Sequence, residues 1–473
     1  MSPGAWRGAP IVLSRVERLR GLDTAFLYLE TPTTHLHVAW AVVLDTRERP
    51  DAASPSRVCE LIGGRLHLLP ALRRRLADPR LGYTQPDWVD VDVVPADHCR
   101  VHHSDDLEAV AADVLARPLD RHRPLWEIHV VEGLPDGRTG MIMKLHHAVL
   151  DGPSGAELMV QLLDLERDPA APVPSVPIAV DPQPTRAARA RVAWRRASRA
   201  GPRAAAEMRK AVDVLAGTQR WDLEHPNAAV PGAFAAPRTP FNQPITARRA
   251  VRFSGVPLDD IEKLRRDTGS TVNDVVLATT GGALRRYLQR RHALPAAALQ
   301  AMVPVSTRDN RSPSGGNQLS ALVTTLGTDI RDPVERLAHV TRVTNDVKRR
   351  HDDTGLASLV GLTDVVSPRA AEGLIRLVAR LRVAEWGLLP FNVVVSNVPG
   401  PDTPFYCNGA LVESAYPMGP ITDWSALNVT VVSYRRYLAF GLVACPDVIP
   451  DLDELRHDLD TEIDALRRTA ATA

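Results

Sequence analysis

The chain has 473 residues, of which 44% are hydrophobic and 24% are charged, as is ordinary for a globular protein. Its formal net charge is +1, so no whole-chain electrostatic field favours nucleic acid as a partner. The four cysteines are scattered and form no C-x-x-C pair, which indicates neither a disulfide framework nor a zinc site and fits a reducing compartment.

In the first 165 residues, apolar β-rich runs alternate with stretches of helical spacing. Strands are predicted at 36–44, 126–132 and 140–145, and helices at 56–66 and 107–116. The turn Pro135-Asp136-Gly137 indicates a hairpin between the last two strands. The second strand of this hairpin leads directly into His146 and His147, and helical spacing resumes after Gly152.

The middle of the chain has the composition of a connection between domains. Residues 166–182 carry repeated prolines, which is typical of a linker. Residues 185–217 are basic and rich in alanine and are predicted to be helical, and residues 225–247 are again punctuated by proline. We therefore expect an N-terminal domain at 1–165, a crossover at 166–247 and a C-terminal domain at 248–473.

The second half repeats the alternation of helices and strands. Helices are predicted at 259–268, 271–291, 333–350, 372–383 and 450–466. Strands are predicted at 300–306, 318–326, 393–398, 411–414, 427–433 and 438–443. Asp332 and Pro333 form the N-cap and first position of the third helix. The pattern predicts an α/β (α+β) fold with two sandwich domains.

The run from His146 to Gly152 (HHAVLDG) is the strongest candidate for chemistry. It lies where a strand ends and a helix begins, and such loops often carry reactive side chains. A histidine can take a proton from a hydroxyl and return it to a leaving group. Gly152 permits a sharp turn, and Asp151 could cap the helix or anchor an arginine. Adjacent histidines in an extended strand point to opposite faces, so only one enters a given pocket.

The run from His146 to Gly152 also has other interpretations. A histidine pair more often serves packing or lies at the surface. Metal-binding histidine pairs on helices are spaced i, i+4 with further ligands, so adjacent histidines favour no metal site. The segment Gly152-Pro153-Ser154-Gly155 lacks the G-x-S-x-G elbow of serine hydrolases. No phosphate-binding loop or dinucleotide motif follows a predicted strand.

The seven-residue run matches the HHxxxDG motif of the CoA-dependent acyltransferase superfamily. Further segments resemble, in order, motifs of the bacterial wax ester synthase/diacylglycerol acyltransferases. They are Leu22–Leu27 with His35–Val38, Pro124–Glu127 (PLW), Asn273-Asp274 (ND), Pro304–Arg308, Gly316-Asn317, Ser396–Pro401 and Leu427–Val429. The resemblance covers about residues 19–468, which is nearly the whole chain.

This resemblance implies two chloramphenicol-acetyltransferase-like domains with a tunnel between them. Acyl-CoA would be a substrate and no cofactor would be needed. The acceptor would be diacylglycerol, giving triacylglycerol, or a long-chain alcohol, giving a wax ester. Left open are an acyltransferase for a carrier-protein-bound or polyketide substrate and a non-catalytic lipid-binding homologue.

The resemblance also assigns roles to residues of this chain. His147 would be the general base, with His146 and Gly152 supporting it. Asp151 would anchor the loop through Arg308. The predicted substrate-binding residues are Pro124, Leu125, Trp126, Asn273 and Asp274, for which core packing and helix capping are the alternative.

Membrane contact is expected to be peripheral. No signal peptide is recognised and no apolar run reaches the roughly 20 residues that span a bilayer, so we expect a cytoplasmic protein. The basic segment 185–217 is either a solvated helical face or a contact with anionic lipid or a lipid droplet. The sequence predicts no oligomeric state.

Overall fold

The computed structural model describes residues 17–19, 21–78, 86–149, 155–169, 186–306, 319–356 and 389–470. Its first large sheet contains β2 (His37–Asp45), β5 (Cys99–His103), β6 (Trp126–Leu134), β7 (Arg138–His146), β12 (Tyr406–Cys407) and β13 (Ala410–Met418). The strand order is β12-β13-β2-β7-β6-β5. A small sheet of β1 (Glu17–Arg18), β4 (Asp87–Asp90) and β3 (Arg74–Leu76) belongs to the same half of the chain.

The second large sheet contains β8 (Ala250–Pro257), β9 (Gln300–Ser306), β10 (Leu319–Thr325), β11 (Val393–Val398), β14 (Leu427–Tyr434) and β15 (Tyr437–Ala444). Its order is β10-β9-β11-β14-β15-β8. The pairs of β11 with β9 and with β14 are parallel and the others are antiparallel. Each sheet therefore contains both parallel and antiparallel pairs. Together with the helices they form the predicted α/β (α+β) class of fold.

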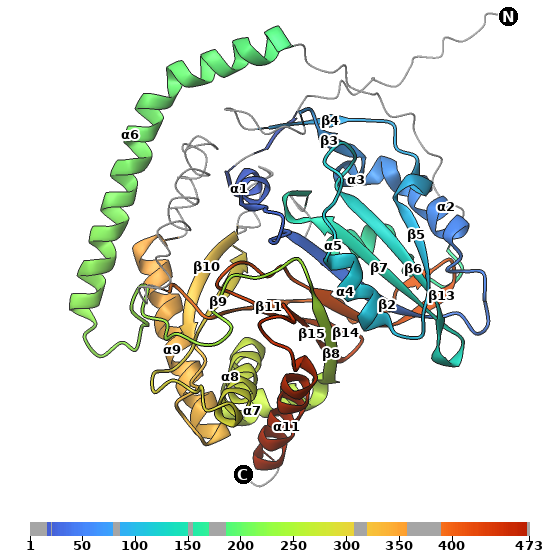
Figure 1. Cartoon of the computed structure of the whole chain (residues 1–473). Coiled ribbons are helices and arrows are strands. Elements are labelled where there is room, and N and C mark those ends of the chain that lie inside the picture. Colours follow the sequence, from blue (N-terminus) through green and yellow to red (C-terminus); the bar gives the residue numbers. More distant parts are fainter. Residues whose placement is uncertain are drawn as a thin grey trace, which may run out of the picture.

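Helices accompany each sheet (Figure 1). Beside the first lie α1 (Gly21–Leu29), α2 (Pro55–Arg65), α3 (Pro70–Arg73), α4 (Leu107–Leu115) and α5 (Gly155–Leu162), with the 3-10 turns η1 (Leu66–Leu68), η2 (Pro95–His98), η3 (Pro135–Gly137) and η4 (His147–Val149). Beside the second lie α7 (Leu258–Thr268), α8 (Val272–Arg290), α9 (Pro333–Thr354) and α11 (Leu452–Ala470). The predicted cap of α9 is confirmed, since the Asp332 carboxylate accepts from the N–H groups of Val334 and Glu335. The helix predicted at 372–383 lies outside the described residues.

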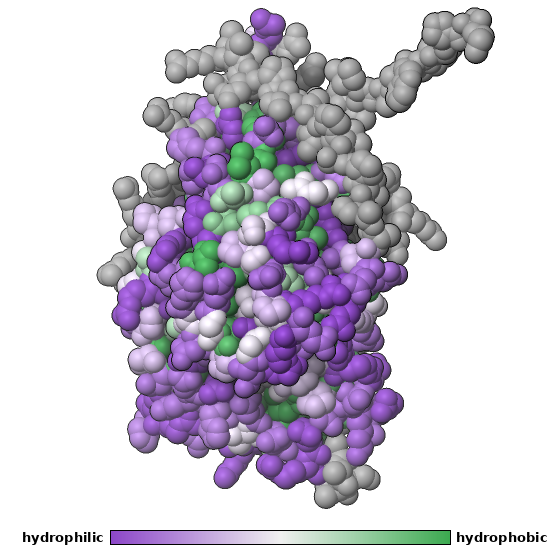
Figure 2. Space-filling model, turned by 90° about the vertical axis from the view of Figure 1, so that its right-hand side faces the viewer, coloured by the Kyte–Doolittle hydropathy of each residue, from purple (hydrophilic) through white to green (hydrophobic). Residues whose placement is uncertain are grey.

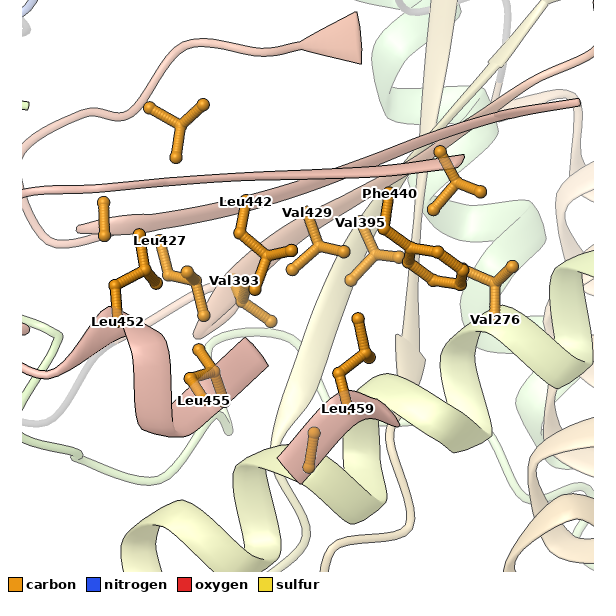
Figure 3. Close-up of a cluster of buried hydrophobic side chains, with 14 of the residues drawn as sticks. Val276, Val393, Val395, Leu427, Val429, Phe440, Leu442, Leu452, Leu455 and Leu459 are labelled. Carbon is orange, nitrogen blue, oxygen red and sulfur yellow. The ribbon is translucent and has the colours of Figure 1, made fainter. Parts of the chain in front are cut away.

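The core of the second half lies between its sheet and the helices α8 and α11 (Figure 3). Alternate residues of each strand point to the same face of a sheet. The inward residues include Val393, Val395, Leu427, Val429, Phe440 and Leu442 from the strands, facing Val276 of α8 and Leu452, Leu455 and Leu459 of α11. Alternation of residues with a period of two is the pattern that predicts these strands from the sequence.

A strand from the C-terminal half completes the first sheet. β13 pairs antiparallel with β2, with Tyr416 opposite Ala41 and Met418 opposite Ala39. At the junction of the sheets β15 passes close to β13, because a Cβ at Gly441 would meet the carbonyl oxygen of Pro417 at 1.8 Å. The domain boundaries predicted at 165 and 247 stay a prediction. They did not include the insertion of β13, which comes from the C-terminal half, into the sheet of the N-terminal half.

The middle segment forms one long helix, α6 (Arg186–Glu224). This confirms the helix predicted at 185–217 and extends it by two turns. Figure 1 shows α6 along the outside of the molecule, with its C-terminal end beside α9. There Ala211, Val214, Thr218 and Trp221 are buried, and the Trp221 Nε1–H donates to Asp353 at 3.0 Å.

Candidate active site

The two histidines lie at the end of β7, as predicted. His146 is the last residue of the strand, and His147 opens the turn η4. The His146 N–H donates to the Leu125 carbonyl at 3.0 Å, and the His147 N–H donates to the Leu36 carbonyl at 2.8 Å. These two hydrogen bonds fix the backbone of the turn to the residues that directly precede β6 and β2.

The His147 ring lies against α1. It stacks on Phe26, with ring centroids 4.0 Å apart and an interplanar angle of 28°. Its Nδ1 is buried and has no hydrogen-bond partner among the residues that the structure describes. Burial lowers the pKa of His147 to about 4. The imidazole is therefore neutral at neutral pH, and a proton on Nδ1 leaves the lone pair on Nε2.

His146 turns into the protein interior instead. Its Nδ1 accepts from the Ala148 N–H at 3.1 Å, so the proton of the neutral ring is on Nε2. That Nε2 lies 3.7 Å from Oε2 of Glu30. Burial lowers the pKa of His146 below its usual value. The two rings have different neighbours, since His147 stacks on Phe26 and His146 faces Glu30.

Glu30 is a site residue that the sequence reasoning missed. Its carboxylate also lies 3.5 Å from Nε2 of His37 and accepts from Nε of Arg121 at 3.0 Å. Burial would raise the pKa of Glu30, but the adjacent His146 and His37 side chains and the charge of Arg121 hold it well below its usual range. The available signal was spacing, because Glu30 follows the last residue of α1 and lies four residues after Phe26. The α1 segment thus contacts both histidines, yet no helix was predicted there.

The PLW segment supports the histidine turn by packing. Trp126 is fully buried, and its Nε1–H donates to the Leu72 carbonyl at 2.7 Å. The Trp126 ring stacks on His98 with centroids 4.2 Å apart. Leu125, which receives the His146 N–H, is also fully buried, and Pro124 is buried. These contacts favour the packing alternative, and substrate binding by this segment stays a prediction.

The ND segment forms a helix cap. Thr271 is the N-cap of α8: its hydroxyl accepts from the Asp274 N–H at 3.2 Å, and its own N–H donates to the Asp274 carboxylate at 2.9 Å. The sequence suggested Asn273 as a cap of this helix. The cap is Thr271, and Asn273 lies within the first turn. The buried Asp274 closes the reciprocal half of the capping box. A role of Asn273 and Asp274 in substrate binding stays a prediction.

Three predicted residues lie outside the described part of the chain: Asp151, Gly152 and Arg308. The proposed anchoring of the loop through Asp151 and Arg308 stays a prediction. Within the described ranges, no group of three or more histidine, cysteine or acidic side chains could hold a metal ion.

Two distant structures define the class of fold. The first condensation domain of the calcium-dependent antibiotic synthetase is 19% identical, with a TM-score of 0.51 over 97% of each chain. The trichothecene 15-O-acetyltransferase from Fusarium sporotrichioides is 10% identical, with a TM-score of 0.54 over 95% of this chain and 94% of its own. The chain has the two-domain fold of these proteins, which confirms the predicted architecture.

Closer comparisons define the family. The model of the wax ester synthase/diacylglycerol acyltransferase catalytic domain matches residues 19–276, and that of the C-terminal domain matches residues 315–467. The wax ester synthase/diacylglycerol acyltransferase from Marinobacter aquaeolei VT8 is 26% identical, with a TM-score of 0.67 over 96% of this chain and all of its own. A Mycobacterium tuberculosis protein provisionally named a diacylglycerol O-acyltransferase is 34% identical, over 92% of this chain and 87% of its own. The chain belongs to the wax ester synthase/diacylglycerol acyltransferase family and is an acyltransferase.

Proposed function

We propose that this acyltransferase transfers a long-chain acyl group from acyl-CoA to the hydroxyl of diacylglycerol, forming triacylglycerol, and esterifies long-chain alcohols as a side activity. Relatives at 31% and 34% identity that are provisionally named diacylglycerol O-acyltransferases support this acceptor. The observation that carries the chemistry is the neutral His147 at the strand end, stacked on Phe26.

In the proposed mechanism Nε2 of His147 takes the proton of the acceptor hydroxyl. The alkoxide oxygen attacks the carbonyl carbon of the thioester and forms a tetrahedral intermediate. The intermediate collapses as the C–S bond breaks, and the protonated His147 returns its proton to the CoA thiolate. The products are the ester and free CoA, and no acyl-enzyme is formed. General acid–base catalysis of this kind typically contributes about 100- to 10,000-fold.

His146 and Glu30 are proposed to position this base. The Nδ1 of His146 accepts from the Ala148 N–H inside the turn, and its Nε2 faces the Glu30 carboxylate. The His146 and His37 side chains, with the charge of Arg121, hold the pKa of that carboxylate low and keep it ionised. Arg121 also donates to the Leu27 carbonyl of α1 at 2.8 Å. Because α1 carries Phe26, this network fixes both the turn and the ring on which His147 stacks.

The direct test is the release of CoA thiol from palmitoyl-CoA by the purified protein with dipalmitoylglycerol, with hexadecanol or with no acceptor. Thin-layer chromatography identifies the ester. The proposal requires acceptor-dependent thiol release together with triacylglycerol. A non-catalytic lipid-binding homologue would release no thiol, and an enzyme for carrier-protein-bound substrates would leave both lipid acceptors unchanged.

The acceptor preference is a testable prediction. We expect kcat/KM to be about 10- to 100-fold higher for dipalmitoylglycerol than for hexadecanol, at fixed palmitoyl-CoA and matched detergent. The two acceptors present the same hydroxyl to His147, so selectivity must come from how the protein accommodates two chains or one. Apolar pockets discriminate only modestly, so some wax ester should form. A preference for hexadecanol would refute the proposed acceptor and leave acyl transfer standing.

The pH dependence is a second prediction. Because burial lowers the pKa of His147 to about 4, the neutral base should persist well below the usual histidine range. We expect kcat/KM to stay nearly constant from pH 8 to about 5, where a histidine with a pKa near 6.5 would already be protonated. An acid limb centred near pH 6.5 would contradict the neutral buried base.

Stability must be followed in parallel, because the same burial destabilises the fold in acid. The pKa of His37 is also lowered, to about 3, mainly by burial. Below pH 6.5 the unfolded chain binds protons at these histidines and the folded chain does not, so stability falls as pH falls. The loss for His37 is about 2 kcal/mol at pH 5. Circular dichroism at each pH separates unfolding from titration of the base.

We also propose that the protein binds membrane or lipid-droplet surfaces peripherally through α6. Within the described residues, no helix is both long enough and apolar enough to cross a bilayer. On α6, the side chains of Met208, Val212 and Leu215 are 62%, 57% and 56% exposed, and their spacing places them on one face. Arg209 and Lys210 are exposed beside them. An apolar stripe flanked by cations suits the interface of an anionic membrane.

Liposome flotation tests this surface. We expect the protein to float with vesicles containing phosphatidylglycerol at low salt, and binding should weaken as salt screens the charges. Arg209→Glu with Lys210→Glu should abolish flotation. The matched control is charge reversal at Arg265 and Arg266, two exposed residues of α7. No binding at low salt, or equal loss in both variants, would contradict a role of α6.

A further inference from the structure

Two cysteines that are far apart in the sequence lie side by side in the fold. Cys59 is in α2 and Cys99 is the first residue of β5, 40 positions further along the chain. Their Sγ atoms are 2.7 Å apart, and both residues are half-buried free thiols. A disulfide bond is about 2.05 Å long, so a movement of well under 1 Å would join them.

The surrounding contacts hold each thiol in place. α2 packs against η2 and β5, and its last residue, Arg65, donates to the Leu162 carbonyl and to the carboxylate of Asp164. On the other side, His98 immediately precedes Cys99. The His98 ring stacks on Trp126, and its Nδ1 hydrogen-bonds to the Trp126 carbonyl at 2.8 Å. The thiols therefore meet between two anchored elements.

The other two cysteines offer a built-in comparison. Cys407 and Cys445 are fully buried, and burial raises the pKa of Cys407 to about 12. Hydrophilic residues cover most of the side of the molecule on which α2 and β5 lie, and hydrophobic residues form smaller patches there (Figure 2). A water-borne oxidant should therefore reach the half-buried pair more readily than either buried thiol.

We propose that Cys59 and Cys99 are an oxidation site that forms a reversible intramolecular disulfide without disturbing the fold. Hydrogen peroxide is one oxidant: two thiols lose two protons and two electrons, an S–S bond forms, and peroxide is reduced to two waters. A small disulfide such as oxidised glutathione is the other. One protein thiolate attacks it, forming a mixed disulfide and releasing one small thiol. The second protein thiolate then attacks the protein sulfur of the mixed disulfide, forms the Cys59–Cys99 bond and releases the second small thiol. Intracellular disulfides of this type are usually transient and redox-sensing.

The environment of Cys99 affects how fast the pair should react. Burial, with the neighbouring Cys59 thiol, raises the pKa of Cys99 well above its ordinary value. Thiolates are the reactive form, so the reaction of Cys99 should be slow at neutral pH and faster in alkali.

The test uses the full chain treated with hydrogen peroxide or with oxidised glutathione. Free thiols should fall from four to two and return to four with dithiothreitol. Non-reducing peptide mapping should give one link, between the peptides of Cys59 and Cys99. Cys59→Ser or Cys99→Ser should prevent the link, whereas Cys407→Ser should retain it. A constant thiol count, a link to another cysteine or a covalent dimer as the main product would overturn the proposal.

Thermal unfolding provides the second measurement. Closing a loop of 40 residues restricts the unfolded chain, so the oxidised protein should melt about 2–5 °C above the reduced protein. Cys59→Ser should show no shift between the two conditions. A lower melting temperature for the oxidised wild type would overturn the claim that the fold accommodates the bond.

Discussion

The variant His147→Ala is expected to lower kcat/KM for ester formation by at least about 100-fold. Its ring is the neutral base of the proposed mechanism, in which Nε2 takes the hydroxyl proton. An alanine side chain cannot take this proton. The measurement is CoA thiol release with dipalmitoylglycerol, with a circular dichroism melt to show that the variant is folded.

Two further histidines serve as controls for this prediction. His103 is on β5 with its side chain 80% exposed, so His103→Ala should retain full activity. His146→Ala should lose less activity than His147→Ala but more stability, because it removes a fully buried ring from beside Glu30. Activity above a few per cent in folded His147→Ala, or a deeper loss in His146→Ala, would reject His147 as the base.

A large loss of stability is expected for Arg336→Ala, about 3–5 kcal/mol in the free energy of unfolding. The guanidinium is 1% exposed and pairs with Glu462, whose side chain is 2% exposed. It also donates to the carbonyls of Ala278 at 3.2 Å and Ile330 at 2.8 Å. One side chain thus joins α9 to α8 and α11, and its removal leaves a buried carboxylate with only the partly exposed Arg286 as an ionic partner.

Urea unfolding measures this loss of stability. Two further variants show whether it comes from the buried ion pair. Arg342→Ala removes an exposed arginine from the same helix and should change stability by at most about 0.5 kcal/mol. The double variant Arg336→Met with Glu462→Met removes both charges and should be more stable than Arg336→Ala. If Arg336→Ala and Arg342→Ala unfold at the same urea concentration, the buried pair does not stabilise the fold.

Local structure was predictable wherever one short segment carries the whole signal. The alternation of Leu427, Val429 and Val431 gives a strand, and Asp332 followed by Pro333 gives a helix start. Pairing between distant segments has no such signal. Nothing in the residues of β13 shows that they lie beside β2, and nothing around Cys59 shows that it meets Cys99.

For the active site too, features within one segment could be predicted and contacts between distant segments could not. The position of His147 at a strand end could be predicted, because strand, histidines and turn are consecutive in the chain. The roles of Glu30 and Arg121 were not predicted, because Glu30 faces His146 and pairs with Arg121 only after α1 and the loop after α4 have packed together. The motif around Trp126 did not predict its contacts, since the buried ring donates a hydrogen bond to the Leu72 carbonyl far away in the sequence. A role of Trp126 in substrate binding stays a prediction.

The pairing of β13 with β2 also sets the order in which the protein can mature during synthesis. Until the ribosome has translated residue 418, β2 has an unpaired edge next to the strand that carries the histidines. Exposed edges of this kind attract other strands and promote aggregation. The nascent N-terminal half is therefore expected to be prone to aggregation, and the catalytic turn gains its complete sheet only when nearly nine-tenths of the chain has been made.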